Sequence, residues 1–356
     1  MPTLHLVLAR SEEGTHDGRG LSMFIYDKND GGVDVRRIEN KLGIHGSPTC
    51  ELVYKNAKAE LCGERKLGLI KYVMALMNGA RLGIAAQSVG LSQVHTMRLW
   101  LMQKDRKQFG KAIIEFPAVY DMLATIKAKL DAGRALLYQT SRYVDIYKAL
   151  DDIARERKLT PEERQEQKRY AKLADSFTPL AKGMNSEYAN QNAYDCIQVH
   201  GGSGFMMEYA CQRIYRDARI TSIYEGTTQL QTVAAIRYVT NGAYAATLHE
   251  YELIPCAPEF EGYLNRIKDM TRKLEACTNA VKEAQNQELL DFVARRLYEM
   301  AAVCVMSHLL LQDATKAPEL FAQSLNVYVN YAESEVEKHF NFIRKFNAEE
   351  LASYRK

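Results

Sequence analysis

Glu225 stands between a tyrosine and a glycine in the segment SIYEGTTQLQ, residues 222–231. A carboxylate can serve as a general base that removes a proton from an acidified carbon. The threonines and apolar residues that follow have helical character, and a carboxylate in the first turn of a helix is favoured by the helix dipole. The residue types therefore leave two interpretations open: a catalytic base, or an ordinary carboxylate at a helix N-terminus.

Two other segments carry residue types suited to binding a ligand. Residues 198–205, QVHGGSGF, hold three glycines in four positions, which let a ligand approach the backbone and leave N–H groups for an anion. Residues 105–111, DRKQFGK, place Arg106 near Phe109, a guanidinium for a phosphate and a face for a planar ring. Each also has an ordinary interpretation, a turn between helices for the first and a solvated helix C-terminus for the second.

The first part of the chain predicts β-structure that gives way to helices. Short runs rich in β-forming residues occur at 4–10 and 21–27, within a β-like region over residues 1–62. From Lys66 the pattern becomes helical, with long helices expected over 72–104 and 118–150. The predicted fold class is mainly α with a small N-terminal β part.

Later segments are also expected to be helical. Thr160 is followed by a proline and by Glu163 at the third helical position, which predicts a capped helix start. After about residue 240, apolar residues at alternating steps of three and four form a single stripe: Ile267, Met270, Leu274, Cys277 and Val281. We interpret this last segment as a packing or oligomerisation module.

Composition narrows the function classes. A net charge of +3 gives no reason to expect a nucleic-acid surface. Seven scattered cysteines without a CxxC pair or a nearby histidine pattern indicate reduced thiols in a cytoplasmic protein, and no metal site is expected. We expect no apolar run that approaches the ~18 residues of a membrane span, and residues 1–10 lack the apolar core of a signal peptide.

Taken together, the motifs resemble the acyl-CoA dehydrogenase family, flavoproteins that desaturate acyl thioesters. The resemblance rests on RKQFGK, QVHGGSGF, IYRDARI and IYEGTTQLQ in this order, preceded by RLGIAAQSVGLSQ, which is similar to the first long helix of the family's C-terminal bundle. It implies a partial middle β-domain over 1–64, a C-terminal four-helix-bundle domain over 65–240 and an additional helical extension over 241–356.

The resemblance also implies a role for each matching residue. Glu225 would be the base that takes the α-proton of the thioester while hydride passes from the β-carbon to N5 of FAD. The residues expected to contact FAD are Arg106, Gln108, Phe109, Gln198, Gly201, Gly202, Thr227 and Gln229. The residues expected to contact the acyl-CoA substrate are Asn78, Arg81 and Gly226. An electron-transfer flavoprotein is the expected acceptor, and the expected assembly is a homodimer or homotetramer.

The sequence departs from the family pattern in places. Asn78 stands where the family usually has aspartate, and Ala80 occupies a position where some relatives carry the base, which leaves Glu225 as the candidate. The family begins with a helical domain and flavin-binding strands that have no counterpart here. We therefore expect a C-terminal part of a longer protein, which alone folds but binds FAD weakly and turns over acyl-CoA poorly. The alternative is a non-catalytic relative, either a stress-response or DNA-binding protein or an oligomerisation fragment.

Overall fold

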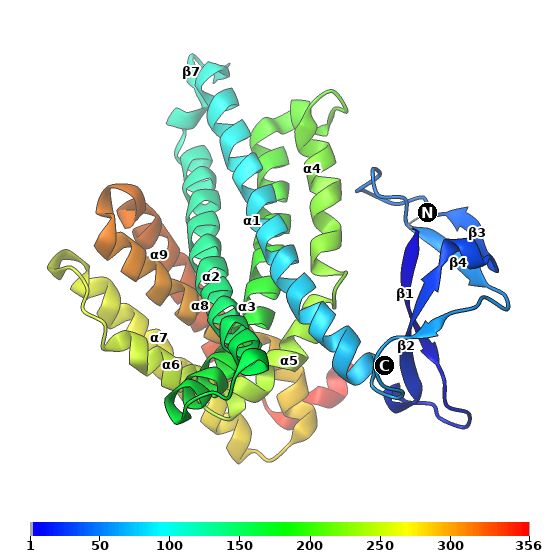
Figure 1. The fold of residues 1–356 in the computed structure, drawn as a ribbon. Coiled ribbons are helices and arrows are strands. Elements are labelled where there is room, and N and C mark those ends of the chain that lie inside the picture. Colours follow the sequence, from blue (N-terminus) through cyan, green and yellow to red (C-terminus); the bar gives the residue numbers. More distant parts are fainter. Residues whose placement is uncertain (1–2, 356) are drawn as a thin grey trace. The chain divides into compact units, whose positions relative to one another are not determined.

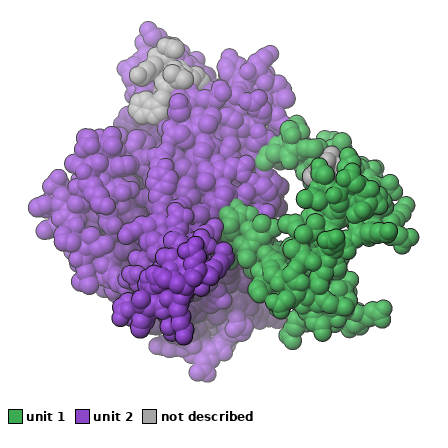
Figure 2. Space-filling view, viewed as in Figure 1, with its two compact units in different colours: residues 1–81 green, residues 82–356 purple. Residues whose placement is uncertain are grey.

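The structure, a computed structural model, describes residues 3–355, and it describes the side chains of all of these except residues 100–105. The chain divides into two compact units, Met1–Arg81 and Leu82–Lys356, which Figure 2 colours separately. The smaller unit holds the N-terminal strands and the larger one is helical apart from one short hairpin, so the predicted fold class is confirmed.

The smaller unit is built from two antiparallel sheets. One sheet has the order β1-β2-β5 and the other pairs β3 with β4. The strands are β1 (Leu4–Arg10), β2 (Leu21–Asp27), β3 (Val33–Ile38), β4 (Cys50–Tyr54) and β5 (Glu60–Leu61). The first two coincide with the predicted runs at 4–10 and 21–27. Their register pairs Leu4 with Asp27 and Arg10 with Leu21.

Three aromatic rings join these sheets on one face. His5 Nδ1 lies 2.9 Å from the Tyr54 hydroxyl, and the Tyr26 ring packs edge-on against the Tyr54 ring with centroids 5.7 Å apart. The opposite face of β1 leaves Leu4, Leu6 and Leu8 exposed. β1 therefore buries only every second residue, as expected for a strand with one packed face.

The first long helix, α1 (Met74–Asp105), follows a π-helical turn over Gly68–Val73. The segment Gly68–Leu99 is long and apolar enough to cross a membrane by length and composition alone, so the expectation that no run approaches that length is wrong. Core helices of soluble proteins can meet the same two criteria. Only 6% of its most apolar window is buried, however, so several of its apolar side chains are exposed in the single chain, among them Met74, Leu76 and Met97.

The larger unit is an assembly of long helices with short connections (Figure 1). A small hairpin, β6 (Lys107–Gln108) and β7 (Lys111–Ala112), follows α1. The remaining helices are α2 (Pro117–Glu156), α3 (Pro161–His200), α4 (Ala210–Ala218), α5 (Thr228–Thr240), α6 (Ala243–Glu252), α7 (Glu261–Glu283), α8 (Gln287–Lys316) and α9 (Pro318–Lys345). The helices predicted over 72–104 and 118–150 are therefore confirmed.

The start of α3 has the predicted cap. The Thr160 side chain accepts from the Glu163 N–H at 3.2 Å, and the Glu163 carboxylate accepts from the Thr160 N–H at 2.9 Å. The Arg157 guanidinium binds the same carboxylate through two nitrogens, at 2.7 and 2.8 Å. These hydrogen bonds lower the pKa of Glu163 to about 2.

A main hydrophobic core, separate from a smaller cluster around Leu99 and Ile126, spans most of the larger unit. It includes residues of α2 and α3 together with residues of α7, α8 and α9. The stripe predicted on α7 faces this core, since Ile267, Met270, Leu274, Cys277 and Val281 are all buried. Each residue of α8 from 300 to 306 is also buried, which is typical of a helix surrounded by others. The C-terminal helices thus share their core with α2 and α3.

The contact between α3 and α8 requires a glycine. The Tyr298 hydroxyl of α8 donates to the Pro179 carbonyl of α3 at 3.1 Å. A Cβ atom at Gly183 would lie 2.0 Å from the Tyr298 hydroxyl oxygen. Gly183 therefore lets the tyrosine reach the α3 backbone.

A buried histidine of α8 makes stability depend on pH. His308 is almost fully buried, and desolvation lowers its pKa to about 4. The unfolded chain binds this proton near pH 6.5, whereas the folded chain stays neutral until about pH 4. The free energy of unfolding therefore falls as the pH drops through this window.

We expect the wild-type protein to lose about 2 kcal/mol more than a His308→Gln variant between pH 7 and pH 5. Urea titrations of both proteins at the two pH values measure the difference. An equal loss in the two proteins would show that His308 is not held neutral by burial.

Candidate functional site

The Glu225 loop connects α4 to α5. A 3₁₀ turn over Arg219–Ser222 follows α4, and α5 begins at Thr228 with Thr227 as its N-cap, whose side chain accepts from the Leu230 N–H at 3.3 Å. Glu225 precedes this cap and is not in the first turn of the helix. The alternative that it is an ordinary first-turn carboxylate is therefore wrong.

The backbone of this loop has an uncommon conformation. Glu225 has φ of 54° and Gly226 has φ of 91°. A non-glycine residue in the left-handed region costs about 1–3 kcal/mol and is found where the surroundings enforce it, often at functional sites. The Glu225 side chain is half-buried. Glu225 thus lies outside the regular helix, in a backbone conformation that its surroundings must maintain.

Side chains of α3 and of the first turn of α5 hold the loop. Lys182 Nζ donates to the Gly226 carbonyl at 2.7 Å. Gln231 Nε2 donates to the carbonyls of Gly226 at 3.0 Å and Glu225 at 3.3 Å. The Thr228 hydroxyl donates to the Glu187 carboxylate at 2.5 Å. Lys182, Gln231 and Glu187 were not among the residues predicted from the sequence.

The residue before Glu225 is also fixed. The Tyr224 hydroxyl donates to the Gln87 side chain, and burial raises the pKa of Tyr224. The phenol therefore remains a hydrogen-bond donor at neutral pH. This contact ties the loop to α1.

The structure brings Arg106 and the glycine-rich turn together. Arg106 donates to the His200 carbonyl at the end of α3. Gly201 has φ of 57°, and a Cβ atom there would lie 3.3 Å from the Arg106 guanidinium. A Cβ at Gly202 would meet no atom within 4 Å, so this backbone is open to a ligand. A guanidinium beside exposed backbone suits a phosphate group.

His200 contributes no charge to this turn at neutral pH. Burial is the main cause that lowers its pKa, with smaller contributions from the guanidiniums of Arg106 and Arg98. The His200 Nδ1 atom lies 2.7 Å from the Cys196 carbonyl. Arg106 therefore supplies the positive charge next to Gly201.

The other predicted cofactor residues are exposed near the Glu225 loop or near the glycine-rich turn that follows α3. Phe109 is 93% exposed at the tip of the β6–β7 hairpin, with φ of 48°, so its ring can meet a flat ligand. Gln108 and Gln198 are exposed on the hairpin and on the last turn of α3. Thr227 and Gln229 are exposed beside Glu225. Gly226, between Glu225 and Thr227, is half-buried.

The predicted substrate residues Asn78 and Arg81 lie on the first part of α1. The Arg81 guanidinium donates to the Asn78 side-chain oxygen at 3.0 Å. Arg81 is buried and Asn78 is exposed. Both belong to the smaller unit, whereas Glu225 belongs to the larger one.

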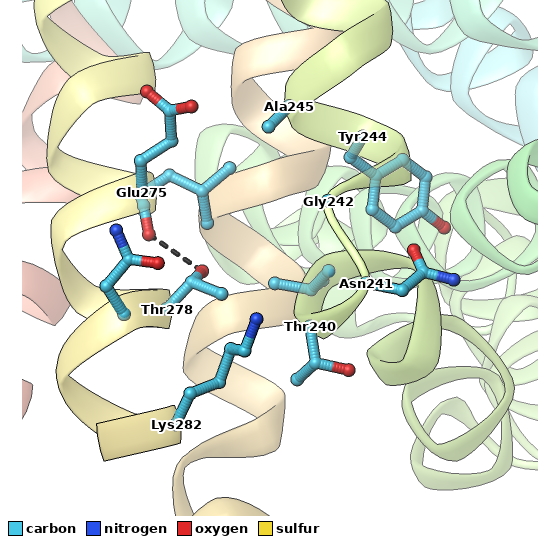
Figure 3. Close-up of a pocket in the computed structure, with 11 residues that line it drawn as sticks. Thr240, Asn241, Gly242, Tyr244, Ala245, Glu275, Thr278 and Lys282 are labelled. Carbon is cyan, nitrogen blue, oxygen red and sulfur yellow. Dashed lines mark hydrogen bonds between the residues drawn. The ribbon is translucent and has the colours of Figure 1, made fainter.

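A separate cavity of about 160 Å³ lies between the α5–α6 turn and α7 (Figure 3). Asn241 and Gly242 line it from the turn, and Glu275, Thr278 and Lys282 line it from α7. The Thr278 hydroxyl donates to the Leu274 carbonyl at 2.8 Å. Among the described residues, none of the predicted site residues lines this cavity.

Comparison with known families defines the class of protein. Residues 1–57 match the middle domain of acyl-CoA dehydrogenases, residues 70–238 match their C-terminal domain, and residues 240–351 match a further acyl-CoA dehydrogenase C-terminal family. These matches follow the same order as the motifs and together cover most of the chain. The chain belongs to the acyl-CoA dehydrogenase family.

Curated relatives with different named activities are similar to part of this chain. The chain is 34% identical over 247 residues to 3-methylmercaptopropionyl-CoA dehydrogenase of Ruegeria pomeroyi. The aligned region covers 64% of this chain and 40% of that protein. It is 33% identical over 217 residues to the CarC subunit of the caffeyl-CoA reductase-Etf complex of Acetobacterium woodii, with 60% and 50% covered. The chain thus spans about half the length, or less, of these curated relatives.

A solved structure shares the fold over almost the whole chain. Acyl-CoA dehydrogenase from Bacillus anthracis, complexed with FAD, superposes with a TM-score of 0.79 at 22% identity and covers 99% of this chain and 63% of that one. This likeness supports the arrangement of strands followed by helices. Roles for individual residues are proposals.

Proposed function

We propose that this chain carries the catalytic base and part of the FAD and acyl-CoA sites of an acyl-CoA dehydrogenase. The observation that carries the proposal is the Glu225 loop, in which a carboxylate is held in a left-handed conformation outside α5 and is followed by a glycine. It lies within the segment that matches the family's C-terminal domain.

Glu225 would perform the proton transfer. Its carboxylate takes the proton from the α-carbon of the thioester, and the electron pair of that C–H bond forms the α,β double bond. Bound FAD supplies the acceptor for the hydride that leaves the β-carbon. Because the loop backbone is fixed by Lys182 and Gln231, the carboxylate needs little reorganisation before it reacts.

The residues around Gly201 fit the phosphate part of FAD. Arg106 places a guanidinium beside Gly201, the backbone of Gly202 is open, and Phe109 presents an exposed ring. We assign Gln108 and Gln198 to the same group by their family positions. Thr227 and Gln229 would contact the flavin near Glu225, while Asn78, Arg81 and Gly226 would contact acyl-CoA.

Anaerobic addition of acyl-CoA thioesters to the flavin-loaded protein tests the function. We expect bleaching of the flavin absorbance and formation of the enoyl-CoA product with at least one member of a panel of chain lengths. A flavin-loaded protein that no thioester bleaches would favour a non-catalytic relative.

Arg106 gives a prediction for flavin binding. We expect Arg106→Ala to lower the flavin content of the purified protein and to raise the Kd for FAD about tenfold or more, because a charge-assisted hydrogen bond to pyrophosphate is lost. Absorbance of the purified variant and titration with FAD measure the effect. Arg272→Ala on α7 is the control, since Arg272 is exposed and pairs only with its helical neighbour Asp269 among the described contacts. Equal flavin affinity in both variants would indicate that Arg106 is an ordinary cation at a helix end and does not bind FAD.

The partners follow from the same proposal. An electron-transfer flavoprotein is the proposed acceptor, supported by the relative that belongs to a reductase-Etf complex. A cytoplasmic homodimer or homotetramer is the proposed form. The exposed apolar side chains Leu76 and Met97 on α1 support association through this helix.

A further inference from the structure

Two fully buried polar side chains lie directly beneath the Glu225 loop. Lys182, in the middle of α3, and Gln231, in the first turn of α5, have no exposed surface. A buried ammonium is costly unless strong hydrogen bonds compensate its lost hydration. The Gly226 carbonyl, 2.7 Å from Lys182 Nζ, provides such a bond.

The same carbonyl is shared with Gln231. Gln231 Nε2 lies 3.0 Å from the Gly226 oxygen and 3.3 Å from the Glu225 oxygen. Two consecutive carbonyls are therefore held on the buried side of the loop. Because both peptide bonds are trans, the N–H groups of Gly226 and Thr227 point away from Lys182 and Gln231.

These contacts account for a conformation that the local sequence does not favour. Glu225 at φ of 54° would relax to a right-handed or extended conformation in an unsupported loop. Fixing both neighbouring carbonyls removes that freedom. A third contact, from the Thr228 hydroxyl to Glu187 at 2.5 Å, anchors the start of α5 to α3.

We propose that Lys182 and Gln231 are positioning residues, which hold the backbone of Glu225 and Gly226 so that the carboxylate stays at one place. In this role they act through the two backbone carbonyls that they bind. The assignment of a reaction to this loop rests on the proposed function, whereas the support of the loop by Lys182 and Gln231 does not.

The first test measures the loop itself. In Lys182→Met, which keeps the unbranched shape of the side chain but lacks the terminal donor, we expect amide hydrogen exchange across residues 222–231 to be about tenfold faster or more, with exchange in the middle of α8 unchanged. Gln231→Leu should have the same effect, and Lys182→Arg should restore part of the protection. The two sites give independent variants if one of them fails to fold.

Lys129→Met is the matched control. Lys129 is another buried lysine of this unit, but its ammonium lies over the Tyr331 ring, 4.5 Å from the ring centroid, and far in sequence from the loop. Its removal should leave exchange at residues 222–231 as in the wild type. Faster exchange of the loop in Lys129→Met as well would mean that general destabilisation, and not positioning, explains the result.

The second test separates positioning from binding. With a thioester that bleaches the wild type, Lys182→Met and Gln231→Leu should lower kcat about tenfold or more while KM changes less than about threefold. Wild-type loop exchange and wild-type kcat in both variants would overturn the inference. Faster loop exchange in a protein that oxidises no thioester would instead overturn the proposed function and leave the positioning role intact.

Discussion

We expect the Glu225→Gln variant to bleach its flavin with acyl-CoA at least about a hundredfold more slowly than the wild type, the range in which loss of a general base falls. Glutamine has the same shape and cannot accept the proton. The loop should stay in place, because Lys182 and Gln231 bind the backbone carbonyls of Glu225 and Gly226, which the substitution leaves unchanged. Rapid mixing of the flavin-loaded protein with acyl-CoA under anaerobic conditions measures this rate.

Two controls accompany that measurement. Flavin content and the Kd for acyl-CoA should be nearly unchanged in Glu225→Gln, which separates chemistry from binding. Glu250→Gln replaces an exposed carboxylate of α6 that pairs with Arg169, and it should bleach like the wild type. Bleaching of Glu225→Gln within about tenfold of the wild type, equivalent to 1.4 kcal/mol of barrier, would exclude Glu225 as the base.

The second large effect concerns stability. Leu310 of α8 is fully buried in the core that joins α8 to α2, α3, α7 and α9. We expect Leu310→Ala to lower the free energy of unfolding by about 2–5 kcal/mol, through lost burial and the cavity that remains. Urea unfolding followed by far-ultraviolet circular dichroism measures the change.

Leu320→Ala is the matched comparison. Leu320 lies on α9 but is 59% exposed, so its truncation should change the free energy of unfolding by no more than about 0.5 kcal/mol. Equal unfolding midpoints for the two variants would show that α8 is not the central helix of the unit. A large loss in Leu310→Ala alone would show that the C-terminal helices and the bundle depend on one core.

Elements with a regular apolar pattern could be predicted from the sequence. The strands at 4–10 and 21–27 follow from β-forming runs bounded by glycine-rich turns. The buried stripe on α7 follows from its steps of three and four, and the start of α3 follows from Thr160 and Glu163. In each case local sequence and tertiary packing favour the same structure.

The candidate site could be predicted only in part. Glu225, Arg106 and Gly201 belong to short motifs, but the sequence did not reveal that the Arg106 guanidinium lies next to Gly201. Lys182 was missed because a single lysine in a helix is usually solvent-exposed. Its burial depends on the Gly226 carbonyl, which lies 44 residues further along the chain.

For α1, the sequence predicts the helix but not what covers its apolar side chains. The sequence predicts a long helix here that resembles the first helix of the family's bundle, yet Leu76 and Met97 are exposed in the single chain. An apolar side chain can be covered by a second copy of the chain or by other sequence. Hydrophobic periodicity predicts that a face is buried and does not identify its partner.

Exchange of the α-hydrogens of a thioester in D₂O tests the role of Glu225 most directly. 3,3-Dimethylbutyryl-CoA suits this measurement because it has α-hydrogens but no β-hydrogen, so proton abstraction can be observed without oxidation. We predict that the flavin-loaded wild type incorporates deuterium at the α-carbon, detected by mass spectrometry, and that Glu225→Gln incorporates it at least about a hundredfold more slowly. Exchange in Glu225→Gln at the wild-type rate would contradict the assignment of the base.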